Sequence, residues 1–411
     1  MTNKIQKTSQ IFLMTFLGLA AFYVSGYSEG VLKKGTLEEY YPDGAVSSRQ
    51  NFKNGTLNGP SKIFYENGKV MSESEYLNGM LEGISRSYYE DGALYLEKEF
   101  KNDALNGLSK EYFENGKPKS QEMYAHDQLN GLSQYYYDDG TLKYLMNFKD
   151  GVLEGGSKEY YPSGNIKNEV NYKRGQWDGL IKQYNESGEI DSEWTYQNGV
   201  RHGSAKMYWP RGKVKWEANF VKDQIQGLSL SYDENGNVIM EANFKDNQLN
   251  GPVKEFYENK VLKSMAQYKN DQKDGDFKEF FENGKVRIER AYEHGQEAGE
   301  SKEYHDNGSL WMTRSYAADG HSGILKEYYE TGELKQEWPV KDGSMQGLSK
   351  SYYKTGELMS EELYVHGQKD GISRLYYQNG HPAYTDTYKA DVRIHRKSYD
   401  ENGKLKSDSE K

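Results

Sequence analysis

The chain has 411 residues, of which 35% are hydrophobic, and its mean hydropathy is −1.00. This length would ordinarily form two or three globular domains at about 150 residues each, but the apolar content is too low for several thick cores. Simple disorder is excluded as well, because disordered chains are poor in aromatic residues and this one is 14% aromatic.

The absence of cysteine excludes disulfides, thiolate metal sites, cysteine nucleophiles and a lipidated N-terminal cysteine. The formal net charge of −10 has the wrong sign for a general binder of nucleic acid or of anionic membrane surfaces. We therefore expect no nucleic-acid partner, and contact with a membrane only through the N-terminal segment.

The first 30 residues differ from the rest of the chain. Lys4 and Lys7 precede an apolar run over residues 11–24, which is short for a membrane span of about 20 residues. A basic start, such a run and small residues after it are typical of a secretory signal peptide, with Val24 and Gly26 at the cleavage site. Residues 1–26 are predicted to be a signal peptide or an uncleaved membrane anchor, and residues 27–34 a linker. A buried helix is the remaining alternative. Export would place the protein in the periplasm, in the cell envelope or outside the cell.

Internal repetition decides the expected fold. Fifteen glycines recur at a constant spacing of 24 residues, without insertion or deletion. They are Gly35, Gly59, Gly83, Gly107, Gly131, Gly155, Gly179, Gly203, Gly227, Gly251, Gly275, Gly299, Gly323, Gly347 and Gly371. Fifteen tandem units thus cover residues 35–394, and residues 395–411 hold a degenerate terminal repeat and a polar tail.

Within each unit, numbered from its glycine as position 1, the pattern predicts two strands. Position 6 is aromatic in all fifteen units, position 18 in fourteen, and position 7 in all but those of Asn185, Asp233 and His305. Glycine every 10–14 residues leaves no room for a long helix, and tyrosine-rich runs favour strands. We expect an all-β chain of antiparallel hairpins.

The turns predict the register. The segment Tyr41-Pro42-Asp43-Gly44 indicates a type I turn followed by a left-handed glycine. Position 7 then closes against 11, position 6 faces 12, and position 5 faces 13. That register makes cross-strand pairs of Glu111–Lys119, Glu159–Lys167, Glu255–Lys263, Glu279–Arg287 and Glu327–Lys335.

A second, two-residue turn at positions 20–21 sets position 18 against 23. By alternation, positions 6, 12 and 18 share one face and position 7 lies on the other. One extra residue must be absorbed between positions 23 and 6, and we expect a bulge at the glycine of position 1.

The unit resembles the bacterial variant of the MORN (membrane occupation and recognition nexus) repeat, as in Gly107-Leu108-Ser109-Lys110-Glu111-Tyr112-Phe113-Glu114-Asn115-Gly116-Lys117. The resemblance recurs fifteen times. It implies an elongated, single-layer antiparallel array of hairpins, solenoid-like, in which each unit contacts mainly its neighbours. Some short bacterial relatives are labelled antitoxin components of toxin–antitoxin systems.

The aromatic residues of position 7 form the candidate interaction stripe, because amphipathic rings on a rigid surface suit recognition of protein or glycan. Stacking that merely stiffens the sheet is the alternative. The stripe consists of Tyr41, Tyr65, Tyr89, Phe113, Tyr137, Tyr161, Tyr329, Tyr353 and Tyr377.

Catalysis requires a unique constellation in a pocket, and a uniform array repeats the same residues instead. His126, His294 and His366 fall on turn tips, the glutamates of position 15 suit salt bridges, and the basic residues of position 4 are offset by glutamates. We expect no enzyme activity, no metal and no cofactor. The leading hypothesis is an exported or anchored repeat scaffold that binds a protein; alternatives are a surface glycan or cell-wall binder and an antitoxin-like neutralising binder.

Overall fold

The computed structural model describes residues 34–317 and 321–410, and this part of the chain is all-β, with forty antiparallel strands and no helix. The predicted signal or anchor segment 1–26 lies outside the described residues, as do residues 27–33 of the predicted linker. Lys34, which we assigned to the linker, is the first residue of strand β1 (Lys34–Tyr40).

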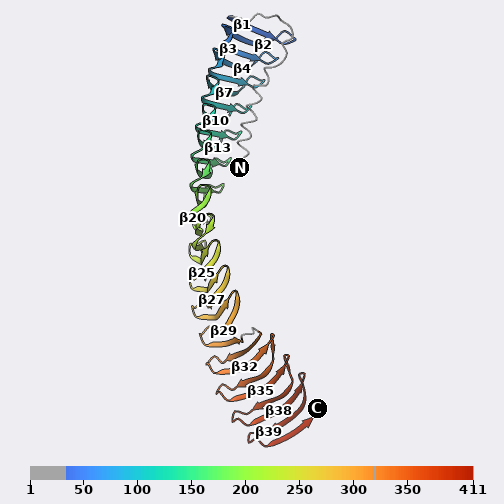
Figure 1. Ribbon diagram of the computed structural model, residues 1–411. Helices are drawn as coiled ribbons and strands as arrows, with labels where there is room; N and C mark the ends of the chain where they lie inside the picture. Colours follow the sequence, from blue (N-terminus) through green and yellow to red (C-terminus); the bar gives the residue numbers. More distant parts are fainter. Residues whose placement is uncertain (1–33, 318–320, 411) are drawn as a thin grey trace. The chain divides into compact units, whose positions relative to one another are not determined.

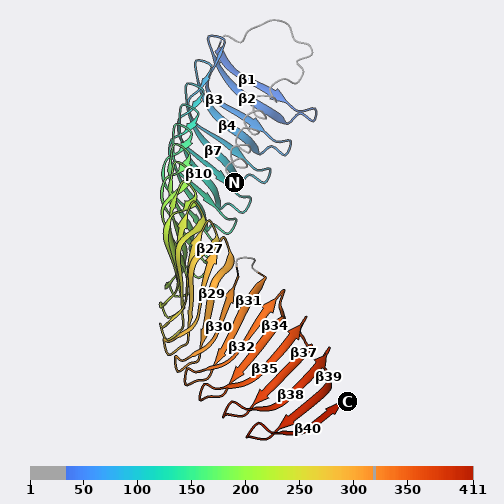
Figure 2. The same cartoon turned by 60° about the horizontal axis from the view of Figure 1, so that its bottom comes forward.

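The chain divides into two bodies. The first holds residues up to 141 together with 148–151, and the second holds 142–147 and the residues from 152 onward. Each is an open, single-layer sheet in which strands pair with their neighbours along the chain (Figure 1). Figure 2 shows β27 to β40 of the second body side by side in chain order.

The first fourteen strands along the chain are β1, β2 (Val46–Lys53), β3 (Thr56–Phe64), β4 (Val70–Leu77), β5 (Met80–Leu81), β6 (Gly83–Tyr88), β7 (Leu94–Lys101), β8 (Ala104–Leu105), β9 (Gly107–Tyr112), β10 (Pro118–Ala125), β11 (Gln128–Leu129), β12 (Gly131–Tyr136), β13 (Leu142–Lys149) and β14 (Val152–Leu153).

The following strands are β15 (Gly155–Tyr160), β16 (Ile166–Lys173), β17 (Gln176–Trp177), β18 (Gly179–Tyr184), β19 (Ile190–Gln197), β20 (Val200–Tyr208), β21 (Val214–Val221), β22 (Gln224–Ile225), β23 (Gly227–Tyr232), β24 (Val238–Lys245), β25 (Gln248–Phe256), β26 (Leu262–Lys269), β27 (Gln272–Phe280) and β28 (Val286–Glu293). The chain continues with β29 (Gln296–Tyr304), β30 (Leu310–Tyr316), β31 (Ser322–Tyr328), β32 (Leu334–Lys341), β33 (Ser344–Met345), β34 (Gly347–Tyr352), β35 (Leu358–Val365), β36 (Gln368–Lys369), β37 (Gly371–Tyr376), β38 (Pro382–Lys389), β39 (Val392–Tyr399) and β40 (Leu405–Glu410).

Both predicted turns are confirmed. In the first unit the amide of Tyr41 donates to the carbonyl of Ala45 at 2.7 Å, and the amide of Gly44 donates to the carbonyl of Tyr41 at 2.9 Å. The second turn has positive φ at both central residues, 53° at Asn54 and 81° at Gly55, which is the type I′ geometry of two-residue hairpins.

The predicted pairing of position 5 with position 13 is wrong. Tyr40 faces Val46, as expected, but Glu39 faces Ser48, so that position 13 is an extra residue in a bulge. Four of the five expected Glu–Lys or Glu–Arg pairs still form, at 2.7–3.0 Å, because the bulged cation reaches back to the glutamate. At the fifth pair, Ser264 donates to Glu255 and Lys263 lies over the ring of Tyr257.

A bulge at the repeat glycine is confirmed between β2 and β3 and at equivalent joints, but it holds two extra residues and not one. The expected bulge is absent at Gly323, which faces Tyr316 without a register shift. Gln50 faces Ser61 and Phe52 faces Leu57, so Asn51 alone lies opposite the three residues 58–60. Two extra residues leave the alternation of side chains unchanged, whereas the single extra residue at position 13 reverses it.

As a result, positions 6 and 18 lie on opposite faces of the sheet, and their predicted common face is wrong. Face one carries positions 2, 4, 6, 15 and 17, which in one unit are Leu348, Lys350, Tyr352, Glu361 and Leu363. Face two carries positions 3, 5, 14, 16 and 18, which are Ser349, Ser351, Ser360, Glu362 and Tyr364. The rings of position 7 also belong to face two and not to the face opposite position 18.

Burial is concentrated on face two. Position 3 is buried in eleven units, at Ser61, Ser109, Ser133, Ser157, Ile181, Ala205, Ser229, Val253, Ser301, Ser349 and Ser373. The tightest apolar cluster consists of Ala205, Ala218 and Phe220, against which Trp194 and Trp216 pack. A single-layer sheet therefore has one packed side and one open side.

Turns of successive units hydrogen-bond to each other. Asn67 donates from Nδ2 to the carbonyl of Glu90 at 3.1 Å, and Lys69 donates from Nζ to the carbonyl of Asp91 at 2.7 Å. At the other turn, Oδ1 of Asp103 accepts from the amide of Leu81 at 2.6 Å. Each hairpin is thus joined to the next at both ends as well as along its strands.

The C-terminal segment is more regular than the sequence predicted. Residues 405–410, which we assigned to a polar tail, form the exposed strand β40, paired with β39 as the second strand of a sixteenth hairpin. This hairpin lacks the repeat glycine, and its register shift contains one residue fewer than those of the other units.

Excision of a whole unit tests this architecture. Deletion of residues 227–250 joins equivalent positions, so we expect circular dichroism to retain the β spectrum and the melting temperature to fall only slightly. Deletion of residues 227–238 removes half a unit and joins positions that cannot pair; it should abolish the local structure. Equal loss of structure in both deletions would contradict the array.

Gly347 provides a local test. Its φ is +117°, and an added Cβ would lie 2.9 Å from the ring of Pro339. Gly83 has φ +84° and nothing within 4 Å of an added Cβ. We expect Gly347→Ala to destabilise its unit by about 1–3 kcal/mol and Gly83→Ala by less, as measured by amide hydrogen exchange in β34 and β6. A larger loss of stability in Gly83→Ala than in Gly347→Ala would show that the contact with Pro339 does not destabilise the unit.

Candidate functional site

Face one carries a ladder of alternating charge. Position 15 pairs with position 4 of its own unit and with position 4 of the next, so Glu73 lies between Lys62 and Arg86, and Glu97 between Arg86 and Lys110. The nitrogen–oxygen distances along this series are 2.9, 3.7, 2.9 and 3.1 Å. The basic residues of position 4 are therefore matched by carboxylates.

The tyrosines of position 6 complete this ladder, since their hydroxyls donate to the glutamate of position 15 in the preceding unit. Hydrogen bonds of 2.6–3.1 Å join Tyr88 to Glu73, Tyr184 to Glu169, Tyr208 to Glu193, Tyr232 to Glu217, Tyr304 to Glu289, Tyr352 to Glu337 and Tyr376 to Glu361.

These contacts shift the pKa values of both the glutamate and the tyrosine. The hydroxyl of Tyr88 and the ammonium of Lys62 lower the pKa of Glu73. Burial, together with this hydrogen bond, raises the pKa of Tyr88 to about 12. The carboxylates of position 15 thus accept hydrogen bonds from tyrosine and form ion pairs with position 4, which is the salt-bridging role predicted for them.

The predicted interaction stripe of position 7 is half-buried throughout. Seven of its hydroxyls donate to the backbone carbonyl of position 6 in the next unit, at 2.5–3.0 Å. These are the hydroxyls of Tyr41, Tyr65, Tyr89, Tyr161, Tyr329, Tyr353 and Tyr377. The structure therefore gives these rings a role in joining units.

Cations of position 13 lie over several rings of position 7. Lys167 Nζ is 5.6 Å from the ring centre of Tyr161, and Lys215 Nζ is 4.4 Å from that of Trp209. Between Tyr89 and Phe113 an open depression of about 400 Å³ remains, with Lys119 on its border. A recognition role for the stripe stays a prediction.

Sequence reasoning missed a recurring exposed apolar feature, an aliphatic column at position 2 of face one. Its members are between 41% (Leu348) and 49% (Leu228) exposed. The aliphatic column consists of Ile84, Leu132, Leu180, Leu228, Ile324, Leu348 and Ile372. The recurrence of Leu or Ile directly after the repeat glycine was visible in the sequence, but its exposure was not.

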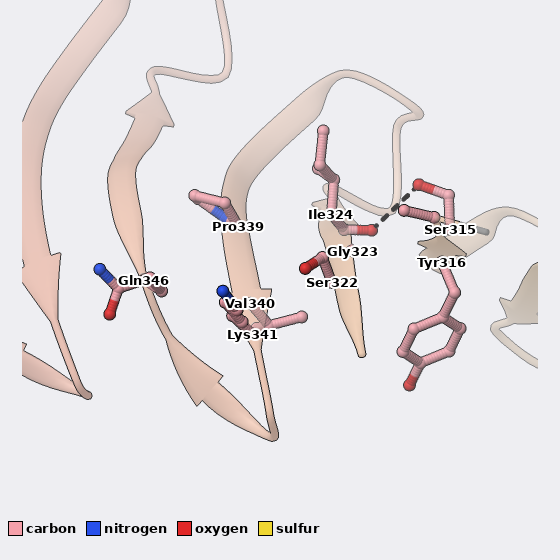
Figure 3. A pocket seen from close by; sticks show the side chains of 10 residues that line it. Ser315, Tyr316, Ser322, Gly323, Ile324, Pro339, Val340, Lys341 and Gln346 are labelled. Atoms are coloured by element: carbon pink, nitrogen blue, oxygen red, sulfur yellow. Dashed lines mark hydrogen bonds between the residues drawn. The ribbon is translucent and has the colours of Figure 1, made fainter. Parts of the chain in front are cut away.

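In the second body the column is densest between β31 and β37. Ile324 faces Pro339, Leu348 faces Leu363, and Ile372 follows on β37. These five apolar residues lie on strands about 4.8 Å apart, so they form a continuous apolar stripe. At its start is a depression of about 460 Å³ lined by Tyr316, Ile324 and Pro339 among others (Figure 3).

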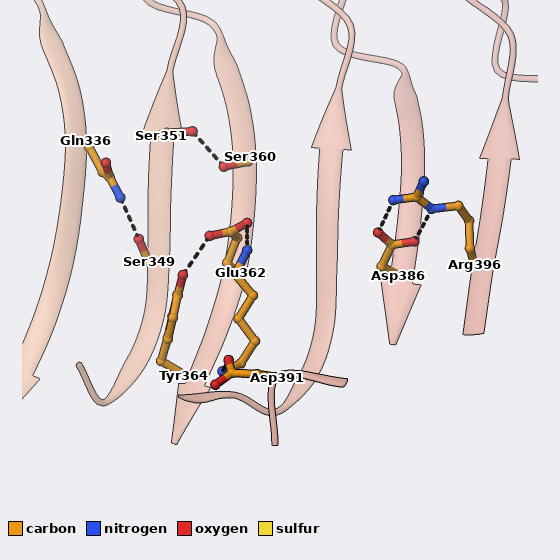
Figure 4. Close-up of polar contacts among 10 residues, drawn as sticks. Gln336, Ser349, Ser351, Ser360, Glu362, Tyr364, Asp386, Asp391 and Arg396 are labelled. Atoms are coloured by element: carbon orange, nitrogen blue, oxygen red, sulfur yellow. Dashed lines mark hydrogen bonds and ion pairs between the residues drawn. The ribbon is translucent and has the colours of Figure 1, made fainter. Parts of the chain in front are cut away.

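Face two of the same body is polar near its C-terminal end (Figure 4). Tyr364 donates to Glu362 at 3.0 Å, and Lys369 lies 2.5 Å from the other oxygen of the same carboxylate. Arg396 makes two 2.6 Å hydrogen bonds to Asp386. Such bidentate pairs are geometrically specific, and here they hold β38 against β39.

Face two carries a tryptophan-rich region around β17 to β21. The rings of Trp194 and Trp216 are 6.2 Å apart, and Trp177 meets Tyr196 edge-on at 5.0 Å. Arg201 covers Phe220, with its guanidinium 4.7 Å from the ring centre. Of the three tryptophans, only Trp177 is strongly exposed, at 41%.

The predicted turn histidines are confirmed as turn residues, with φ of 49–50° at His126, His294 and His366. Among residues 34–317 and 321–410, no group of three or more His, Asp or Glu side chains is arranged to hold a metal ion. The same part of the chain has no helix with the length and apolar character to cross a bilayer.

A family model for the MORN repeat variant matches the chain fifteen times. The chain belongs to the MORN repeat variant family. The matched residues are 33–54, 57–78, 81–102, 105–126, 129–150, 153–174, 177–198, 225–246, 249–270, 273–294, 298–318, 322–342, 345–366, 369–390 and 394–410.

One MORN unit falls between these matches, at residues 203–224. It nevertheless forms the same hairpin, because Gly203 faces Phe220 and Tyr208 faces Val214 as the equivalent residues do elsewhere. Ala205, Trp209 and Trp216 stand in this unit where Ser229, Asp233 and Met240 stand in the next one, while its turn glycines and the aromatic residues of positions 6 and 18 are kept.

No curated protein matches the chain. Among solved structures, the TcdB2–TccC3 crystal structure is similar at 12% identity and a TM-score of 0.16, covering 89% of this chain and 27% of that one. The Photorhabdus luminescens Tc holotoxin pore is similar at 11% identity and a TM-score of 0.15, covering 89% and 25%. This chain spans about a quarter of the length of these structures.

The tyrosine–glutamate contacts predict alkaline sensitivity. Burial raises the pKa to about 12 at Tyr88, Tyr95, Tyr184, Tyr208, Tyr232 and Tyr304, whereas unfolded tyrosine titrates near 10. Because the folded state holds these protons more tightly, its stability is complete below about pH 10 and falls as the pH rises toward about 12.

The measurement is the free energy of local opening against pH by hydrogen exchange, with tyrosinate absorbance recorded in parallel. Tyr88→Phe, which cannot ionise, should reduce the loss in β4 to β6 and leave distant units unchanged. Stability that is flat from pH 9 to about pH 12 would contradict this assignment.

Proposed function

We propose that this MORN repeat chain is a non-enzymatic scaffold that binds another protein along face one. The observation that carries the proposal is the aliphatic column, whose members are 41–49% exposed at equivalent places in seven hairpins, of which those of Ile324, Leu348 and Ile372 are successive. Exposed contiguous apolar surface marks interaction sites in soluble proteins, and repetition converts weak single contacts into multivalent binding.

The chemistry of the column favours a protein over a sugar polymer. Aliphatic side chains are buried readily against the apolar side chains of another protein. The ladder of position 4 and 15 charges beside the column, such as Lys326 with Glu337 and Arg374 with Glu361, would supply a polar border. Interfaces commonly have such an apolar centre and polar rim.

We further propose that the chain is exported, on the basis of its N-terminal segment. The basic start and the apolar run of residues 11–24 are typical of a secretory signal or anchor, so we propose that the scaffold works in the cell envelope or outside the cell. Fractionation of cells and sequencing of the mature N-terminus test this part. A mature chain that starts at Met1 in the cytoplasmic fraction would overturn it.

A glycan-binding function is the second candidate, and it rests on Trp177. This side chain is 41% exposed on face two and has Tyr196 edge-on beside it, which is an arrangement that a sugar ring can stack against. Retention of cell-wall polysaccharide that is lost in Trp177→Ala would support this candidate.

Site-specific cross-linking tests protein binding. A photoreactive residue placed at Leu132, Leu228 or Leu348 in cells should cross-link one protein species, identified by mass spectrometry. Met207 and Leu375 are matched controls, because they are apolar, 38% exposed and on face two. Cross-links at the controls only, or none at the column, would contradict the proposal.

Stepwise substitution then measures multivalency. Changing Leu180, Leu228 and Leu348 to serine, singly and together, should weaken binding of the captured partner in increments of about 1–2 kcal/mol per exposed side chain. Tyr161→Phe and Tyr353→Phe change the ring stripe alone and should leave binding unaltered. Loss of binding only in these ring variants would move the site to the stripe of position 7.

A further inference from the structure

Among the described strands, β1 and β40 form the two edges of the array, and both carry an unusual order of charge. Inside the array, position 15 of one unit faces position 4 of the next, and the pairing joins a glutamate to a lysine or arginine, as Glu73 to Arg86. The first unit reverses this order, with Glu38 at position 4 and Arg49 at position 15. Among the fifteen units, only this one has an acid at position 4, and only this one has a base at position 15.

The reversal gives the polar side chains of strand β1 hydrogen-bond partners within their own unit. Glu38 accepts from Arg49 Nε at 2.6 Å and from the hydroxyl of Tyr40 at 2.8 Å. In interior units the equivalent tyrosine donates to the glutamate of the unit before it, as Tyr88 does to Glu73. Glu38 therefore replaces the acceptor that a preceding unit would supply.

The reversal has a cost inside the first unit. Arg49 lies directly opposite Lys62 on the neighbouring strand β3, and like charges in that position are destabilising. No other of the fifteen units has a base at position 15 opposite a base at position 4 of the next unit. We infer that the reversed order has its role at the edge strand and not inside the array.

The other edge strand, β40, presents a second acid at the matching place. Asp408 occupies position 15 of the last hairpin and is held by His395 at 2.5 Å and Lys397 at 3.4 Å. The same hairpin has Asp400 where most units have a ring at position 7. Its carboxylate accepts a hydrogen bond from the amide of Lys404 at 2.8 Å. Asp400 therefore lacks the hydroxyl that a tyrosine at this position donates to the carbonyl of a following unit.

We propose that this charge order blocks head-to-tail joining of two copies of the chain. In the register that all interior units use, β1 of a second copy would place Glu38 opposite Asp408, and Asp400 would meet the carbonyl of Tyr40. Open sheet edges are templates for association, and charged side chains on edge strands prevent it. The repeat that lets hairpins stack within one chain would otherwise let chains stack on each other.

Restoring the interior charge order tests the proposal. The double variant Glu38→Lys with Arg49→Glu gives Asp408 a cation to face, so we expect the full chain to associate in sedimentation velocity, with masses at multiples of one chain. Association should weaken as salt is added, because the new pair is exposed. The interior swap Lys158→Glu with Glu169→Lys is the matched control and should leave the mass unchanged.

The register of the joint can be trapped, since the chain has no cysteine of its own. Position 16 faces position 3 across interior joints, as Gln50 faces Ser61 and Trp194 faces Ala205. Leu37→Cys and Ser409→Cys should therefore form an intermolecular disulfide only in head-to-tail order. We expect this disulfide in the edge-swapped chain, and its loss when Asp408→Lys is added to that chain.

Either of two results would overturn the proposal: the cysteine pair cross-links copies of the otherwise unchanged chain, or the edge-swapped chain stays at the mass of the parent. Circular dichroism and exchange of the β1 amides show whether β1 is still folded. If the double variant unfolds β1, the single variant Asp408→Lys provides the test by sedimentation velocity. It leaves Glu38 in place and gives it a cation to face, so its copies should also associate.

Discussion

Every hairpin of this protein depends on the hairpin that follows it. Two strands alone are marginal in water, and here the missing stabilisation comes from contacts that recur one unit further along. The hydroxyl of Tyr353 reaches the carbonyl of Tyr376 at 2.7 Å, and that of Tyr376 reaches Glu361 of the unit before at 3.0 Å. A period of 24 residues brings each donor to its acceptor, so an inserted or deleted residue must fall where a bulge absorbs it.

A second consequence of the repeat is that the two faces of the sheet differ in burial and chemistry. The extra residue at position 13 places the aromatic residues of positions 6 and 18 on opposite sides. Face two collects the small buried side chains of position 3 and the clusters around Phe220. Face one is left with paired charges and exposed aliphatic residues, so it has apolar surface that no segment of the described chain covers. The proposed protein-binding role follows from that asymmetry.

The two edge strands carry side chains that oppose further growth of the array. An array that grows by identical steps has no intrinsic stop, and its edges would accept a further unit from any source. Reversal of a single ion pair at Glu38 and Arg49 satisfies the first strand internally, while β40 ends the ladder with Asp408. The proposed block on self-joining and the proposed binding of a partner are thus assigned to different surfaces, an edge and a face.

Much of this was readable from the sequence. The glycine period, the type of the first turn, the place and length of the second, the pairing of position 6 with 12 and of 18 with 23, and the family were predicted correctly. Turns and aromatic strands are specified by residues close together in the chain. Four of the five ion pairs from position 5 to position 13 were also anticipated, although the backbone pairing proposed for them was wrong.

What the sequence did not determine was which side chains share a face. The bulge at position 13 leaves no signature in residue type, since Lys167 pairs with Glu159 in either register. The glycine indicates where the second bulge lies, but not that it holds two extra residues. Side-chain direction has a period of two, so one unpaired residue exchanges the faces for the rest of the unit. The exposure of the aliphatic column and the half-burial of the ring stripe were therefore decided only by tertiary structure, where backbone hydrogen bonding selects the bulge and the bulge selects the face.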